Sequence, residues 1–308
     1  MSGTFLARRL LGALGVVLGV ALLTSLLIHL VPGDPVELML GESATAGDRA
    51  ALRTSLGLDR PVHEQLLTQF RRLARLDLGE SLYSRRPVGA VIAERMPATL
   101  ELAAAALAVA VAVALPLGIL AARRQGGIAD GAAMGVALLG LSVPAFWLGP
   151  LLMLVFSVLL GWTPVSGREG LSSLVLPALT LGTGMAAVLA RMLRSSLLET
   201  LSEDYVRTAR AKGLGAGAVV WRHALRNAAL PVVTVFGMQL GALLAGAVIT
   251  ETVFAWPGIG SLLVEAIQRR DFPLVQGCVL LISSTYVAVN ALTDLAYAWL
   301  DPRVRLAS

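Results

Sequence analysis

Six stretches of this sequence contain no charged residue, and each is about as long as a membrane-crossing helix requires. A helix needs roughly 20 apolar residues to cross a bilayer. Only 15% of the 308 residues are charged, whereas a soluble protein carries roughly 25%. These features predict an all-α integral membrane protein with six transmembrane helices. The six stretches are Leu10–Leu30, Leu102–Ala122, Ala132–Leu160, Leu171–Ala190, Ala228–Thr250 and Phe272–Thr293.

The first stretch is expected to be a retained helix. Arg8 and Arg9 precede it, as in a signal peptide, but the apolar core is longer than the usual length of about 7–15 residues. No small-residue cleavage site follows it. The third stretch contains Pro144 and Pro150, which predict a kink.

The distribution of positive charge predicts the orientation in the membrane, because short cytoplasmic loops are enriched in Lys and Arg. With both termini cytoplasmic, only Arg168, Arg269 and Arg270 fall in short external loops. The segment 31–98 is long enough to be largely exempt from the rule. The positive residues on the cytoplasmic side are Arg8, Arg9, Arg123, Arg124, Arg191, Arg194, Arg207, Arg210, Lys212, Arg222, Arg226, Arg303 and Arg305. This bias accounts for the net positive charge without nucleic-acid binding.

The long segment 31–98 is expected to be a small external subdomain. It carries nine acidic and nine basic residues and is therefore neutral. Helical patterns cover Asp48–Leu56 and Val62–Leu76, and in the second Leu66, Leu67, Phe70 and Leu73 share one face. The sequence thus predicts two regions: residues 1–98, the first helix with this subdomain, and residues 99–300, the transmembrane domain.

The cytoplasmic loop 191–227 contains the signals of a short helix. Thr200 and Glu203 fit a capping box, and acidic Glu203 and Asp204 suit the first turn. Arg210 and Lys212 suit the last turn. Gly213 suits the left-handed position that ends a helix. The predicted helix is either a simple connector or an element to which another protein docks.

A second helix is predicted after Gly215-Ala216-Gly217, with Trp221, His223 and Leu225 on it. Pro231 is well placed to begin the fifth membrane helix.

The cytoplasmic loop contains the run Tyr205-Val206-Arg207-Thr208-Ala209-Arg210-Ala211-Lys212-Gly213-Leu214, followed by His223-Ala224-Leu225-Arg226-Asn227 and Leu230-Pro231-Val232. This part of the chain resembles the EAA loop of ABC importer permeases, and more narrowly that of the dipeptide/oligopeptide branch. Gly213 and Ala209 match the glycine and second alanine of the general motif. Arg207 and Thr208 replace its Glu and first Ala, and Arg226 replaces a later proline. These departures are typical of the peptide branch.

Six further segments resemble that branch in the same order along the chain. They are Val31-Pro32-Gly33-Asp34-Pro35, Leu56-Gly57-Leu58-Asp59-Arg60-Pro61, Asp77-Leu78-Gly79-Glu80-Ser81, Arg95-Met96-Pro97-Ala98-Thr99-Leu100-Glu101-Leu102, Glu251-Thr252-Val253-Phe254-Ala255-Trp256-Pro257-Gly258-Ile259-Gly260 and Asp301-Pro302-Arg303.

The resemblance implies a MetI-like type I importer permease fold and alternating-access transport of peptides across the bacterial inner membrane. It implies four kinds of partner: a second homologous permease, two ABC ATPases, an external solute-binding protein and membrane lipid. It also implies that the loop is a coupling helix that contacts an ATPase. The residues assigned to this contact are Glu203, Asp204, Tyr205, Arg207, Thr208, Ala209, Arg210, Ala211, Lys212, Gly213 and Leu214.

The chain itself has no recognisable catalytic or cofactor motif. A phosphate-binding P-loop needs Gly-Lys-Ser/Thr, but the only lysine, Lys212, lies between Ala211 and Gly213. ATP and magnesium are therefore expected in the partner ATPases. One cysteine and three dispersed histidines give no zinc-ligand spacing. We therefore predict neither an enzyme nor a metal site.

In the fifth stretch Gly237, Gly241 and Gly246 form a surface that permits close helix contact. This surface can serve packing within the chain, or the helix can line the pore beside a partner permease. Met238 and Gln239 are the candidate pore residues.

The sequence is also compatible with other functions. Relatives of the peptide branch carry nickel, glutathione, haem or oligosaccharides. An ion-coupled transporter or channel is the main rival, but such proteins usually hold carboxylates deep in the membrane. Here Glu101, Glu251 and Asp294 lie near the ends of the apolar stretches. A membrane enzyme is disfavoured by the lack of a recognisable catalytic motif.

Overall fold

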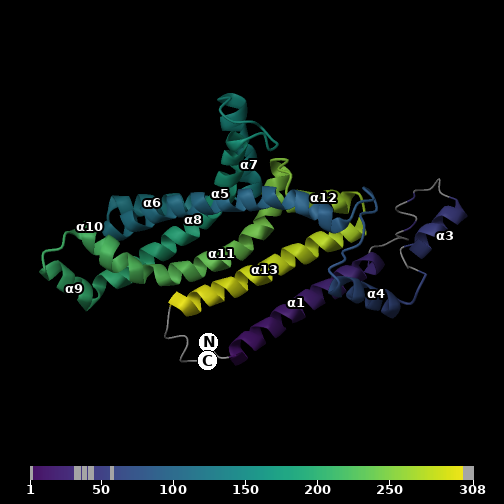
Figure 1. The fold of residues 1–308 in the computed structure, drawn as a ribbon. Helices are drawn as coiled ribbons and strands as arrows, with labels where there is room; N and C mark the ends of the chain where they lie inside the picture. The colour runs from purple at the N-terminus through teal and green to yellow at the C-terminus, as the bar shows by residue number, and fades with distance from the viewer. Residues whose placement is uncertain (1–2, 31–35, 37–39, 41–44, 56–58, 301–308) are drawn as a thin grey trace. The chain divides into compact units, whose positions relative to one another are not determined.

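The computed structural model describes residues 3–30, 36, 40, 45–55 and 59–300. In these residues the regular elements are helices, apart from one isolated bridge between Glu80 and Pro87. Figure 1 shows the ribbon. The elements are α1 Gly3–Leu30, α3 Ala46–Ser55, α4 Val62–Ala74, α5 Val88–Arg123, α6 Ile128–Ser142, α7 Ala145–Leu152, π-helix η1 Met153–Leu159, α8 Leu171–Ser202, α9 Asp204–Ala211, α10 Ala216–Ala218, π-helix η2 Val219–Ala224, α11 Leu225–Val253, α12 Ile259–Gln268 and α13 Phe272–Leu300.

Each charge-free stretch lies in a helix or, for the third, in the sequence α6–α7–η1. In the described residues, α5, α8 and the Phe272–Thr293 part of α13 are long and apolar enough to cross a membrane. The bent pair of α6 with α7 and η1 can make a fourth crossing. In α1, the described apolar part Leu11–Leu26 is shorter than these helices. The count of six crossings stays a prediction.

The predicted kink in the third stretch is a bend of 102° between α6 and the following helix. The break falls at Ser142–Pro144, with Val143 extended and Pro144 as the N-cap of α7. A residue before proline is disfavoured in the α region, which explains why α6 ends here. Pro150 lies inside α7.

The two helices predicted between residues 31 and 98 are present as α3 and α4. On α4, Leu66, Phe70 and Leu73 are half-buried, whereas Leu67 is exposed. The segments 31–35, 56–58 and 301–303, on which parts of the family resemblance rest, lie outside the described residues.

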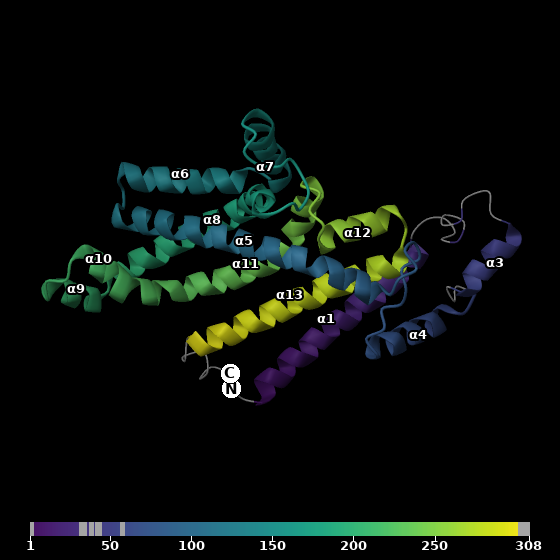
Figure 2. The same ribbon diagram turned by 45° about the horizontal axis from the view of Figure 1, so that its top comes forward.

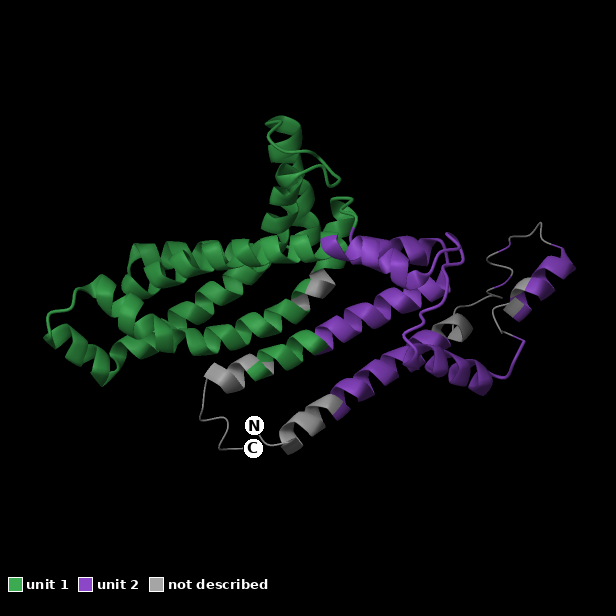
Figure 3. Cartoon of the chain, in the orientation of Figure 1, with its two compact units in different colours: residues 1–2, 98–257, 288–308 green, residues 3–97, 258–287 purple. Residues whose placement is uncertain are grey.

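The chain forms two compact units, coloured separately in Figure 3. Unit 1 comprises Met1–Ser2, Ala98–Pro257 and Ala288–Ser308, and unit 2 comprises Gly3–Pro97 and Gly258–Val287. The division into residues 1–98 and 99–300 stays a prediction.

The core of unit 1 includes five apolar residues, four of them alanines, that recur every four positions on α5. Ala98, Leu102, Ala106, Ala110 and Ala114 are all buried, because this spacing places them on one helix face. They pack in one core with residues of α8 and α11. A Cβ built on Gly182 of α8 would lie 2.7 Å from the Ala106 carbonyl oxygen, so α5 and α8 approach closely there. Figures 1 and 2 show α5, α6, α8 and α11 running alongside one another, with α9 and α10 at one end.

Unit 2 has its own core, in which Val88 and Ile92 of α5 pack with Ile259 and Leu262 of α12 and with Cys278 of α13.

The Asp271 carboxylate, which is 1% exposed, ties the segment before α5 to the start of α13. It accepts hydrogen bonds from the Ser81 hydroxyl at 2.5 Å and from the Leu82 backbone N–H at 3.1 Å.

Candidate functional site

The predicted short helix of the loop 191–227 is α9, Asp204–Ala211. Asp204 lies in its first turn and Arg210 in its last, as the helix dipole favours. Asp204 and Arg207 form an ion pair at 3.4 Å. Both side chains are highly exposed, so this pair adds little stability.

The capping box predicted for Thr200 and Glu203 is wrong. Helix α8 runs on to Ser202, and the Thr200 hydroxyl donates to the Ser196 carbonyl oxygen at 2.8 Å. Glu203 is the N-cap residue of α9, but it makes no capping hydrogen bond with its side chain. The cause is burial: Leu197 and Thr200 are buried in unit 1, so tertiary packing extends α8 past the local stop signal.

The structure confirms the prediction that Gly213 ends the short helix. Its φ is +83°, in the left-handed region. The Gly213 N–H donates to the Arg210 carbonyl oxygen at 2.9 Å, and the Leu214 N–H donates to that of Ala209 at 3.3 Å. This pair of bonds is the Schellman motif, which satisfies carbonyl groups at a helix end. Local sequence alone therefore defines where α9 stops.

Helix α9 has one anchored face and one free face. Val206 and Ala209 are buried in a cluster with Val219, and Leu201 and Leu214 pack against it. Ala209 and Leu214 of the predicted contact set therefore hold the helix in place. The other members are exposed: Glu203, Asp204, Tyr205, Arg207, Thr208, Arg210, Ala211, Lys212 and Gly213. A short helix anchored in this way presents its outer side chains in a fixed arrangement.

A hydrogen-bond link between α9 and α11 was not predicted from sequence. The Asn227 amide donates to the Tyr205 hydroxyl oxygen at 2.8 Å, and that hydroxyl lies 3.5 Å from the His223 carbonyl oxygen. Tyr205 lies on α9 and Asn227 on α11, so this hydrogen bond joins the two helices. The quoted family motifs contain all three residues, but only the fold places them together.

The second predicted helix is present, but it is continuous with the fifth membrane helix. Gly215 is the N-cap of α10, which passes through η2 into α11. The expectation that Pro231 begins the fifth helix is wrong, since it lies inside α11. Neighbouring helices can compensate for the backbone bond that a proline removes from a membrane helix.

An ion pair between half-buried Arg194 and buried Asp130 joins α8 to α6 near this loop. The Arg194 guanidinium donates to both oxygens of the Asp130 carboxylate, at 2.6 and 2.7 Å. Both residues lie outside the charge-free stretches. These bonds, with one from the Gly126 N–H, lower the pKa of Asp130 to about 2. The pair therefore remains charged across the physiological pH range.

The glycine surface on α11 serves packing within the chain at Gly237. A Cβ there would lie 1.8 Å from Cγ2 of Thr293 on α13. Gly241 is also buried, and the surroundings of Gly246 lie outside the described part of the chain. Met238 is 65% exposed and Gln239 is half-buried, so their role in a pore stays a prediction.

The carboxylates expected near the ends of the apolar stretches occupy different environments. Glu101 lies well inside α5, because this helix begins at Val88, and it pairs with Arg168 at 2.6 Å. Glu251 is fully buried in the last turn of α11 and accepts a hydrogen bond from the Thr99 hydroxyl at 2.7 Å. The side chain of Asp294 lies outside the described set. In the described residues no group of three His, Cys, Asp or Glu side chains could hold a metal ion.

Three long apolar helices, with a bent pair that can make a fourth crossing, define a multi-pass membrane protein among the described residues. Residues 114–306 match the binding-protein-dependent transport system inner membrane component, and residues 3–103 match the N-terminal region of the membrane component of binding-protein-dependent transport systems. The chain belongs to this family of transport permeases.

Several relatives align with this chain over nearly its full length, and all are named as transport system permease proteins. The di/tripeptide transport system permease protein DppB of Pseudomonas aeruginosa is 46% identical, and the dipeptide transport system permease protein DppB of Escherichia coli K12 is 45% identical. The glutathione transport system permease protein GsiC of Salmonella typhimurium is also 45% identical. Each alignment covers 98% of this chain and 98% of the relative.

The fold is similar to that of solved ABC transporters. Two inward-facing structures of the MetNI methionine ABC transporter match with TM-scores of 0.55 and 0.58, at 19% and 20% identity. Both matches cover 68% of this chain and 96% of the solved chain. The predicted MetI-like permease fold is thereby confirmed.

Proposed function

We propose that this chain is the permease subunit of an ATP-driven importer that moves short peptides into the cell. The observation that carries this proposal is α9: a helix ended by a Schellman motif at Gly213, anchored by Val206 and Ala209, with an exposed outer face. Such a rigid projection between two long apolar helices is suited to docking an ATPase. A flexible connector would need neither the anchored face nor the fixed end.

The orientation follows from the charge distribution. Arg123 and Arg210 lie in the last turns of α5 and α9, Arg124 lies on the turn after α5, and Arg194 lies in the last third of α8. Cytoplasmic loops are enriched in such residues. The termini and loop 191–227 are therefore cytoplasmic, and segment 31–98 is external.

The transporter needs partners that this chain does not supply. ATP and magnesium are bound by two ATPase subunits, since the only lysine lies in no P-loop motif. A second permease completes the pore, and an external binding protein delivers the solute. ATPase closure displaces α9, and the Tyr205–Asn227 bond passes the displacement to α11. The pore then opens alternately to each side.

Peptides are the substrate that the relatives support best. Their names include di/tripeptides, dipeptides and glutathione, and glutathione is itself a small peptide-like solute. The sequence leaves nickel, glutathione, haem and oligosaccharide as alternative substrates.

The proposal is tested by uptake of a labelled dipeptide into proteoliposomes that contain the complete transporter and its binding protein. We expect uptake to require ATP and to be reduced by excess unlabelled dipeptide or tripeptide, but not by nickel, haem or an oligosaccharide. Uptake driven by a proton or sodium gradient without ATP would instead identify an ion-coupled transporter. ATP-driven uptake that nickel, haem or an oligosaccharide abolishes, and dipeptide does not, would keep the class and overturn the substrate.

A further inference from the structure

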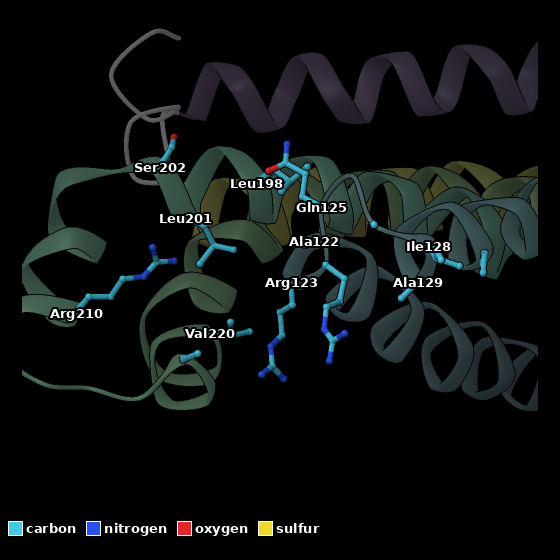
Figure 4. Close-up of a pocket in the computed structure, with 14 residues that line it drawn as sticks. Ala122, Arg123, Gln125, Ile128, Ala129, Leu198, Leu201, Ser202, Arg210 and Val220 are labelled. Atoms are coloured by element: carbon cyan, nitrogen blue, oxygen red, sulfur yellow. The ribbon is translucent and has the colours of Figure 1, made fainter.

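A hollow of about 1090 Å³ lies beside α9 in unit 1. The end of α5, the turn that follows it, the start of α6 and the end of α8 form its walls, with single residues from α9, α10 and η2. Figure 4 shows Leu201 and Val220 between Arg210 on one side and Arg123 on the other. The hollow therefore has an apolar centre and a basic edge.

The charged residues that line this hollow are all basic. Arg123, Arg124 and Arg210 line it, and none of the residues lining it is acidic. Asp130, which follows Ala129 of the lining, is already held by two bonds from Arg194. In the described part of the chain no ion pair involves the three lining arginines. They are available to an anionic ligand.

The hollow lies where two apolar stretches end, which is the level expected for the membrane surface. Ala122 is the last residue of one charge-free stretch and Ala132 is the first residue of the next, and both line the hollow. Ile128, which lies between these two residues in the sequence and also lines the hollow, is 93% exposed. Lipid phosphates lie where hydrocarbon-spanning stretches end. Helix α9, the proposed ATPase contact, contributes only Arg210.

We propose that this hollow binds an anionic phospholipid of the cytoplasmic leaflet. Arg123, Arg124 and Arg210 contact the phosphate group, and Leu198, Leu201 and Val220 contact the apolar part of the lipid. Basic pockets between membrane helices on the cytoplasmic side are suited to such headgroups. A bound lipid joins the turn after α5 to the last turn of α9, so it stabilises the position of α9. The proposal rests on the membrane position of the apolar stretches and on the cytoplasmic orientation, not on ATPase coupling.

The test removes two charges from the hollow and measures lipid binding to the complete purified transporter. In native mass spectrometry with added phosphatidylglycerol, the double variant Arg123→Gln/Arg124→Gln should bind this lipid roughly 30-fold more weakly, at about 1 kcal/mol per arginine. Arg123→Lys/Arg124→Lys keeps the charge and should retain most of the binding. The matched control is Arg222→Gln/Arg226→Gln, which removes two exposed charges from the segment 191–227 outside the hollow and should bind as wild type does.

A second measurement compares ATP hydrolysis in phosphatidylcholine nanodiscs with and without phosphatidylglycerol. The glutamine variant should match the wild type in phosphatidylcholine and lose only the response to phosphatidylglycerol. Equal lipid binding by variant and wild type would overturn the proposal. Loss of the ATPase subunits from the variant in phosphatidylcholine would also overturn it, because the hollow would then be a protein contact. Lipid binding is measured without transport, so its outcome is independent of the uptake experiment.

Discussion

Gly213→Val is expected to reduce peptide uptake and transport-coupled ATP hydrolysis together, by roughly tenfold, while the chain still inserts and folds. Gly213 has a φ of +83°, and a Cβ built there would meet nothing within 4 Å. The effect of the substitution is therefore backbone strain without a clash. A left-handed conformation costs an ordinary L-residue roughly 1–2 kcal/mol, and about 1.4 kcal/mol corresponds to a factor of ten in binding. The strain changes the end of α9 and so weakens its contact with the ATPase.

Two further variants separate this effect from a general effect of valine. Gly217 lies in the same loop, also has open space around a Cβ, and has no positive φ. Gly217→Val should therefore keep near-normal uptake. Gly213→Asn should recover part of the loss, because asparagine tolerates the left-handed conformation at a helix end. If Gly213→Val keeps full uptake and full association with the ATPase, the loop is only a connector.

Gly182→Val is expected to destabilise the fold of unit 1. A Cβ at Gly182 would lie 2.7 Å from the backbone oxygen of Ala106 and 2.9 Å from Cγ1 of Val109, so α5 and α8 would have to separate. Overpacking of this kind costs about 1–3 kcal/mol or more. The measurement is the midpoint of thermal unfolding of the detergent-solubilised chain, which should fall by several degrees.

Gly184→Val is the matched control for this variant. Gly184 lies two residues further along α8, and a Cβ there would meet nothing within 4 Å. Both substitutions carry the same cost in helix propensity. Equal unfolding midpoints for the two variants would show that the close approach of α5 and α8 at Ala106 is not needed for stability.

The positions of the long helices and the end of α9 could be predicted because their causes are local. A backbone inside a membrane must satisfy its own hydrogen bonds, so an apolar stretch of sufficient length forms a helix. The end at Gly213 depends only on the conformational freedom of glycine. Helix α5 was predicted too short, because its first part, from Val88, carries charged residues that a charge-free stretch excludes.

Other features depend on tertiary packing and could not be predicted. The burial of Leu197 and Thr200 extends α8 beyond its local stop signal. Pro231 lies inside α11 although its sequence context favours a helix start. The Tyr205–Asn227 bond joins residues 22 positions apart, and it forms only once the turn at Gly213 has set the direction of the chain. The direction of the bend after α6 depends on packing that the prolines do not specify.

The most direct test of coupling through α9 is the accessibility of residue 208. Thr208 is exposed on α9, and Cys278 is the only cysteine, so Thr208→Cys in a Cys278→Ala background gives a single exposed thiol. A membrane-impermeant thiol reagent should label it in inside-out vesicles stripped of the ATPase, and rebinding of the ATPase should slow the labelling. Labelling in right-side-out vesicles, or a rate unchanged by the ATPase, would contradict the proposed role of α9.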